Sequence, residues 1–105
     1  MKSVPVLLPQ AQDILSELGE NIRFARLRRR LSTAQMAERA GIGRKTFYNI
    51  EQGSPTVSMG SYLQVLFVLN LHKDLAAVAA NDPLGRKLQD AGIRVMKRAP
   101  KRPKH

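Results

Sequence analysis

Apolar residues recur along most of this chain at three- and four-residue spacing, the pattern of amphipathic helices. The first such stripe consists of Ile14, Leu15, Leu18, Ile22 and Ala25. It predicts a helix from Pro9 to about Arg30. Gly19 weakens the middle of that helix by about 1 kcal/mol relative to Ala, which leaves a bend or break there open. No segment alternates with period two for long, so no strand is expected.

Two short helices separated by a corner are predicted next. Ser32 and Gln35 match a capping box, in which each side chain bonds the backbone amide of the other residue. The helix that starts there is expected to end at Gly41, because glycine readily takes the left-handed conformation that closes helices. Gly43 then marks the start of the second helix, which stops at the sequence Gln-Gly-Ser-Pro of residues 52–55.

Further helical segments are predicted in the second half of the chain. Ser58 can cap a helix from Met59 to about Leu69, and a short helix covers residues 73–79. Asp82 followed by proline is a strong start signal for one or two more turns, to about residue 89. The pattern therefore predicts an all-α fold: a compact bundle of about five helices that contains a helix-turn-helix.

Charge is distributed unevenly over these elements. Residues 1–22 carry one Lys against three acids, residues 23–53 carry eight Lys or Arg against two Glu, and residues 91–105 carry six basic groups and no acid. Two basic blocks indicate a polyanionic partner, because such fields concentrate nucleic acid. An ordinary solvated surface is the alternative, but it would be expected to mix both signs.

The outer side of the second helix of the corner carries the candidate chemistry. Phe47 and Ile50, three residues apart, give this helix its inner face. The remaining positions near its start are Arg44, Lys45, Tyr48 and Asn49. These side chains suit phosphates and base edges, whereas a plain helical corner would more often mix Glu and Lys. The pattern therefore predicts a DNA-facing helix.

The stretch LGENIRFARLRRRLSTAQMAERAGIGRKTFYNIEQG resembles the helix-turn-helix of phage-repressor-like regulators, the Xre family with its lambda-repressor-like fold. The resemblance covers about half the chain, residues 18–71. It implies that Arg44, Lys45 and Asn49 contact the bases of double-stranded operator DNA.

The same resemblance places Thr33, Thr46 and Tyr48 at or beside the phosphate backbone. Two positions depart from the family pattern. Thr33 stands where glutamine is usual, which weakens the phosphate contact expected there. Gly43 stands where Ser or Thr usually caps the helix, so a side-chain cap is lost while the backbone amides stay free for a phosphate.

Arginines cluster at the end of the first predicted helix. The family resemblance implies that Arg26 forms a buried ion pair with Glu51, in line with the rule that buried charges are paired. Arg28, Arg29 and Arg30 are predicted to be exposed. They face either DNA phosphates or only solvent.

A second resemblance concerns YLQVLFVLNL and the following KDLAAVAANDPLGRKLQDAG, which are similar to the antitoxins (HipB-like proteins) encoded beside HipA-type kinase toxins. It implies a homodimer that binds operator DNA, holds the kinase toxin and represses its own operon. Apolar residues surround nearly the whole circumference of this helix, so it is either a central core helix or a dimer contact. The candidate dimer contacts are Tyr62, Val65, Phe67 and Val68.

Nothing in the sequence indicates an enzyme, a cofactor or a metal site. The two histidines, His72 and His105, lack plausible companions, and there is no cysteine. GIGRKT lacks the spacing of a phosphate-binding loop. No run approaches the ~20 apolar residues of a membrane span. We therefore expect a cytoplasmic, nucleoid-associated bacterial protein without a membrane partner.

Together these observations predict three parts. Residues 1–9 form an N-terminal extension, residues 10–90 a helix-turn-helix DNA-binding and dimerisation domain, and residues 91–105 a basic mobile tail. The leading hypothesis is a dimeric, sequence-specific repressor that acts as an antitoxin. The alternatives are a stand-alone Xre-type regulator, a protein-interaction module that uses the helix-turn-helix as scaffold, and a nonspecific nucleic-acid binder.

Overall fold

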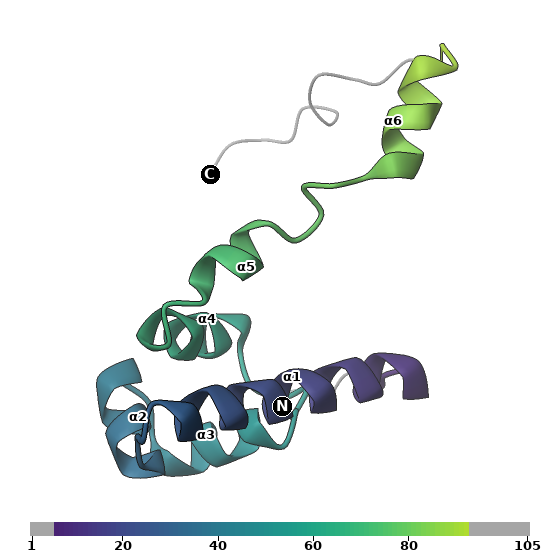
Figure 1. The fold of residues 1–105 in the computed structure, drawn as a ribbon. Coiled ribbons are helices and arrows are strands. Elements are labelled where there is room, and N and C mark those ends of the chain that lie inside the picture. Colours follow the sequence, from purple (N-terminus) through teal and green to yellow (C-terminus); the bar gives the residue numbers. More distant parts are fainter. Residues whose placement is uncertain (1–5, 93–105) are drawn as a thin grey trace, which may run out of the picture.

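A computed structural model describes residues 6–92 of the 105-residue chain. The helices are α1 (Pro9–Arg28), α2 (Thr33–Ala40), α3 (Arg44–Glu51), α4 (Met59–Val68), α5 (His72–Ala76) and α6 (Pro83–Asp90) (Figure 1). No strand occurs among the described residues, and the all-helical prediction is confirmed. The predicted basic tail lies outside the described residues, apart from its first two positions.

Helix α1 runs for 20 residues without a break, so the bend considered at Gly19 does not occur. The glycine serves a different purpose. A Cβ atom at this position would lie 2.5 Å from the backbone carbonyl oxygen of Glu51, at the end of α3. Gly19 therefore allows the backbones of α1 and α3 to approach closely.

The start of α2 is formed as the sequence predicts. The Gln35 amide donates to Ser32 Oγ over 3.0 Å, and the Ser32 amide donates to Gln35 Oε1 over 2.8 Å. This reciprocal pair confirms the capping box. Gly41 ends the helix with a φ of 71°, the left-handed conformation expected there.

The hydrophobic core lies where α1, α2, α3 and α4 meet. Its buried apolar residues are Ile22, Ala25, Met36, Ala37, Ala40, Phe47, Ile50, Tyr62, Val65, Leu66 and Leu69. The Tyr62 hydroxyl donates to the carbonyl oxygen of Ser54 over 2.7 Å. Burial of this side chain raises the pKa of Tyr62 above its ordinary value of 10.0, because desolvation disfavours the phenolate.

Two of the candidate dimer contacts, Tyr62 and Val65, lie in the core. Val65 has no exposed surface and Tyr62 is 7% exposed, because both point into the protomer's own interior. The side of α4 that carries Tyr62 and Val65 therefore forms part of the core, which is the first of the two alternatives considered for this helix.

Three elements follow the corner. Ser58 caps α4 by accepting a hydrogen bond from the Ser61 amide over 3.1 Å, as expected. Helix α5 begins at His72 and ends at Ala76, earlier than predicted, and Ala79 has a left-handed φ of 66° where the prediction continued the helix. Helix α6 starts after its expected cap, Asp82, whose carboxylate accepts from the Gly85 amide over 3.0 Å.

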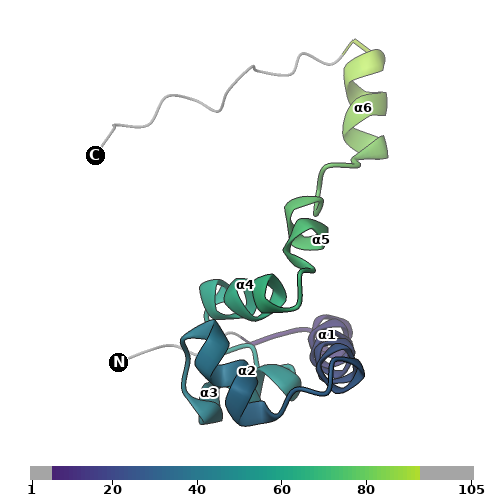
Figure 2. The same cartoon turned by 60° about the vertical axis from the view of Figure 1, so that its left-hand side comes forward.

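Helix α6 stands apart from the other helices. Figures 1 and 2, viewed 60° apart, both show α5 leading away from α4 and α6 lying beyond α5. No residue of α6 is buried, and none belongs to the core. The compact bundle is therefore formed by α1 to α5, and α6 is a sixth helix outside it.

Candidate nucleic-acid interface

The corner between α2 and α3 fixes the direction of α3. After the left-handed Gly41, the Ile42 amide donates to the Ala37 carbonyl oxygen over 3.0 Å. Phe47 and Ile50 of α3 are completely buried, and Ala37 of α2 is 2% exposed. Because its apolar side is held against the core, the opposite side of α3 faces solvent.

The solvent-facing side of α3 carries the residues predicted to read DNA. Arg44 and Lys45 are exposed, and Tyr48 is 60% exposed. Thr46 and Asn49 are half-buried, so they lie at the border of this surface and not on its most exposed part. The cationic start of α3 thus projects outward.

The amino-terminal ends of α2 and α3 leave backbone donors near this surface. Thr33 is exposed and is the first residue of α2. Gly43 precedes α3 in an extended conformation, with φ −70° and ψ 157°, and no side chain caps the helix. Free amides at a helix start carry partial positive charge and suit phosphate groups.

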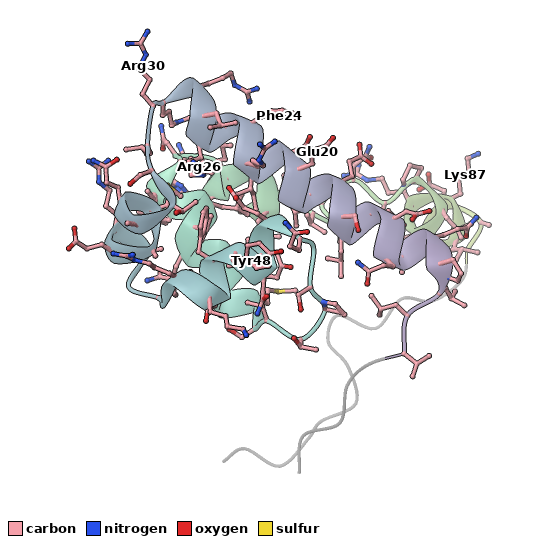
Figure 3. All side chains as sticks on the ribbon, turned by 90° about the horizontal axis from the view of Figure 1, so that it is seen from below. Glu20, Phe24, Arg26, Arg30, Tyr48 and Lys87 are labelled. Carbon is pink, nitrogen blue, oxygen red and sulfur yellow. The ribbon has the colours of Figure 1, made fainter. Side chains whose placement is uncertain are left out.

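Arg28 and Arg30 are exposed at the end of α1. Figure 3 shows Arg30 extending away from the helices, whereas Arg26 lies beneath α1. Arg29 differs from its neighbours. Its Nη1 donates to the Ala25 carbonyl oxygen and its Nη2 to the Leu69 carbonyl oxygen, each over 2.9 Å. Arg29 is exposed as predicted, but its guanidinium ties the end of α1 to the end of α4.

Arg26 and Glu51 form an ion pair between α1 and α3. Arg26 Nε donates to Glu51 Oε2 over 2.8 Å, and Arg26 Nη1 donates to the Leu31 carbonyl oxygen over 2.9 Å. The two side chains are 9% and 7% exposed. Since Glu51 is occupied by this pair, its negative charge is not presented to a DNA partner.

An apolar stripe remains exposed on α4 beside the core. Phe67 is 61% exposed and Val68 is half-buried, so two of the four predicted dimer contacts lie at the surface. Met59 and Leu63 are 73% and 39% exposed and precede Phe67 at four-residue spacing. Sequence reasoning missed these two residues, although their spacing places all three on one side of the helix.

The described residues include neither a cluster suited to a metal ion nor a helix suited to span a membrane. Within residues 6–92, no group of three or more His, Cys, Asp or Glu side chains is arranged to hold a metal ion. The helices in this part of the chain also include none with the length and apolar character needed to cross a bilayer.

The fold and this surface define a helix-turn-helix protein, with a cationic second helix held against a small helical core. The chain belongs to a helix-turn-helix domain family, whose model matches residues 17–79. It is also similar to y4mF of Sinorhizobium fredii (strain NBRC 101917 / NGR234), named as an uncharacterized HTH-type transcriptional regulator. The two are 32% identical over 62 residues, which cover 59% of this chain and 82% of the relative. These matches confirm the helix-turn-helix prediction, and α6 lies beyond the matched family segment.

Proposed function

We propose that this protein is a transcriptional repressor that binds operator DNA sequence-specifically as a homodimer. The observation that carries the proposal is the orientation of α3, which buries Phe47 and Ile50 and leaves Arg44 and Lys45 in solvent. Membership of a helix-turn-helix family and the name of the similar protein support a role in transcription regulation. The proposal includes that this binding takes place in the bacterial cytoplasm, on the nucleoid.

In the proposed complex, α3 lies in the major groove and reads base edges. Arg44 is suited to bind guanine O6 and N7 with two hydrogen bonds, and Asn49 is suited to bind adenine N6 and N7. Lys45 can donate to guanine or to a phosphate. Since Asn49 is half-buried at the border of the surface, it reaches a base only where α3 lies deep in the groove.

Phosphate contacts set the position of α3 without specifying sequence. The proposed contacts come from Thr33 at the start of α2, from Thr46 and Tyr48 on α3, from Arg28 at the end of α1 and from Arg30 just after it. The exposure of Thr33, Tyr48 and both arginines supports this assignment. Because phosphate binding releases counterions, affinity should fall steeply with salt concentration.

The proposed dimer uses the exposed stripe on α4. Phe67 and Val68 belong to it from the sequence prediction, and Met59 and Leu63 extend it along the helix. A two-fold contact pairs this stripe with its own copy. Such a dimer presents two copies of α3 to half-sites about 34 Å apart, one turn of duplex.

Competition binding tests the proposal. A labelled duplex from the region upstream of the gene is challenged with unlabelled random duplex of the same length at physiological salt. A sequence-specific repressor should prefer the upstream duplex by ~10³ or more. Equal competition by random duplex would contradict the proposal and favour a nonspecific nucleic-acid binder. Absence of binding to either duplex would favour a protein-interaction module.

Arg44→Ala and the control Arg86→Ala sharpen this test, since both arginines are exposed but Arg86 lies on α6. Removing a base contact should reduce the preference for the upstream duplex by about tenfold or more, because a bidentate Arg–guanine pair discriminates by about 1–3 kcal/mol. Arg86→Ala should keep the preference. A full preference in the Arg44→Ala protein would refute the assigned role of Arg44.

The narrower proposal is that the repressor is the antitoxin of a toxin–antitoxin operon and holds a HipA-type kinase. Its support is the resemblance of residues 62–92 to antitoxins of that group. A kinase-like reading frame beside the gene, and co-purification of its product with this protein, are the expected results. Without such a neighbour the protein is a stand-alone Xre-type regulator.

A further inference from the structure

An apolar groove runs between α1, α4 and α5. Two adjoining hollows form it, and Leu18 of α1, Leu66 of α4 and Leu75 of α5 line both. Ile14 and Val78 line one end of the groove, and each is 67% exposed. We call this surface the α1–α5 groove. Leu66 belongs to the core and the half-buried Leu18 and Leu75 pack against it, so the exposed apolar surface of the groove comes mainly from Ile14 and Val78.

Helix α6 has an apolar side of matching character. Leu84 is 66% exposed and Leu88 is 41% exposed, and their four-residue spacing places them on one side of the helix. A helix of eight residues is about 12 Å long and too short to be stable alone in water. An isolated amphipathic helix of this kind requires a surface on which its leucines can be buried.

The charges at the two surfaces are complementary. Asp74 lines the groove, and the exposed Glu17 follows Ile14 by about one turn of α1. Exposed Lys87 lies on α6 between the two leucines in sequence. Opposite charges at the rim of an apolar contact favour docking in one register.

We propose that α6 of one copy docks in the α1–α5 groove of a second copy, with Leu84 and Leu88 facing Leu18, Leu66 and Leu75. The inference deepens the homodimer of the proposed function by naming a segment that the two copies exchange. Helix α6 lies outside residues 17–79, the segment that matches the family, whereas Leu18, Leu66 and Leu75 of the groove lie inside it.

The connection between α5 and α6 favours a second copy over the chain's own groove. Val78, at the groove's end, is only four residues before the cap Asp82, and the turn between them contains the left-handed Ala79. Figures 1 and 2 show that this turn directs α6 away from the bundle. Docking in its own groove would require a sharp reversal at the rim, whereas a partner's groove needs none.

Disulfide trapping tests the exchange directly, and the absence of native cysteine makes it clean. One full-length preparation carries Ile14→Cys and a second, distinguished by a mass tag, carries Leu88→Cys. On mild oxidation the mixture should yield a disulfide between the two chains. The control mixture replaces Leu88→Cys with Gln89→Cys, an exposed neighbour on another side of α6, and should yield little.

Two results would overturn the inference. A mixed disulfide no more abundant than in the Gln89→Cys control would show that α6 does not lie in a partner's groove. The second result concerns a single chain that carries both Ile14→Cys and Leu88→Cys. Formation of a disulfide within that chain, in a monomer, would show that α6 docks in its own groove.

Equilibrium measurements separate this inference from the proposed function. The double substitution Leu84→Glu/Leu88→Glu should raise the dimer dissociation constant at least about tenfold in sedimentation experiments, because two apolar side chains lose their buried site. Unchanged dimerisation would contradict the exchange. Half-site base preference should persist in this variant, because α3 is untouched. If the wild-type protein showed no base preference, the proposed function would be refuted but the exchange of α6 would not.

Discussion

At the residue scale, Arg26 determines how α1 meets α3. Its guanidinium bonds Glu51 on one side and the Leu31 carbonyl oxygen on the other, and it lies 5.9 Å from the centre of the Phe47 ring. Little solvent reaches either charged side chain. The pair thus holds α3 in the orientation that exposes Arg44, and each charge depends on the other for compensation.

Breaking this pair should destabilise the domain. Glu51→Ala is expected to lower the free energy of unfolding by about 3 kcal/mol, since it leaves the Arg26 charge buried without a partner. The double variant Arg26→Met/Glu51→Leu should lose less, because it removes both charges together. Urea denaturation followed by circular dichroism measures both values. A double variant less stable than Glu51→Ala would contradict this account of the pair.

Arg30 is expected to lower the stability of the domain, in contrast to Arg26. Its φ of 56° is left-handed, a conformation that costs a residue with a side chain about 1–2 kcal/mol. Arg30→Gly should therefore raise the free energy of unfolding by about 0.5–1 kcal/mol, after allowing for the greater chain entropy of glycine. The same variant should bind DNA more weakly if Arg30 contacts a phosphate. Thermal melts and binding assays separate the two effects, and a less stable variant would contradict the first.

At the element scale, the starts of helices could be predicted from the sequence, but their packing could not. The caps Ser32, Ser58 and Asp82 act within three residues of themselves, so their roles follow from local pattern. The burial of Tyr62 and Val65 depends on which side of α4 meets α2, information that the all-round apolar pattern does not contain. Likewise, the sequence suggested a bend at Gly19, because it does not show that the end of α3, which is distant in sequence, packs against this position.

Glycine substitutions test the close approach of α1 and α3. Gly19→Ala should lower the free energy of unfolding by about 2 kcal/mol or more, because its Cβ would overlap backbone that cannot move freely. Gly60→Ala is the matched control within α4. Its Cβ would meet nothing closer than Ser58 Oγ at 3.8 Å, so it should stabilise by up to about 1 kcal/mol. Equal effects of the two substitutions would contradict the role given to Gly19.

At the scale of the whole molecule, the positive charge is divided between two stretches of sequence, and only one of them contains the residues proposed to read bases. The base-reading candidates lie on α3, within the basic block of residues 23–53, whereas the second basic block falls in residues 91–105. A charge remote from the base edges contributes affinity for any duplex. The two blocks should therefore be separable by experiment.

Deleting residues 93–105 removes six basic side chains. If they contribute electrostatic affinity, binding to the upstream duplex and to random duplex should weaken by a similar factor, and the dependence of affinity on salt should become shallower. Fluorescence anisotropy at several salt concentrations measures all three quantities. A large change in the preference between the two duplexes would contradict the purely electrostatic role.

The proposed function depends on the reading of bases by Arg44, Lys45 and Asn49 of α3. Selection of preferred sites from a random duplex pool tests it most directly, with wild type, Arg44→Ala, Asn49→Ala and the control Arg86→Ala compared. Paired half-sites are expected for the wild type and the control. Each α3 variant should lose the preference at one base pair per half-site, and the base pair should differ between the two variants. Identical selected sites for all four proteins would contradict it.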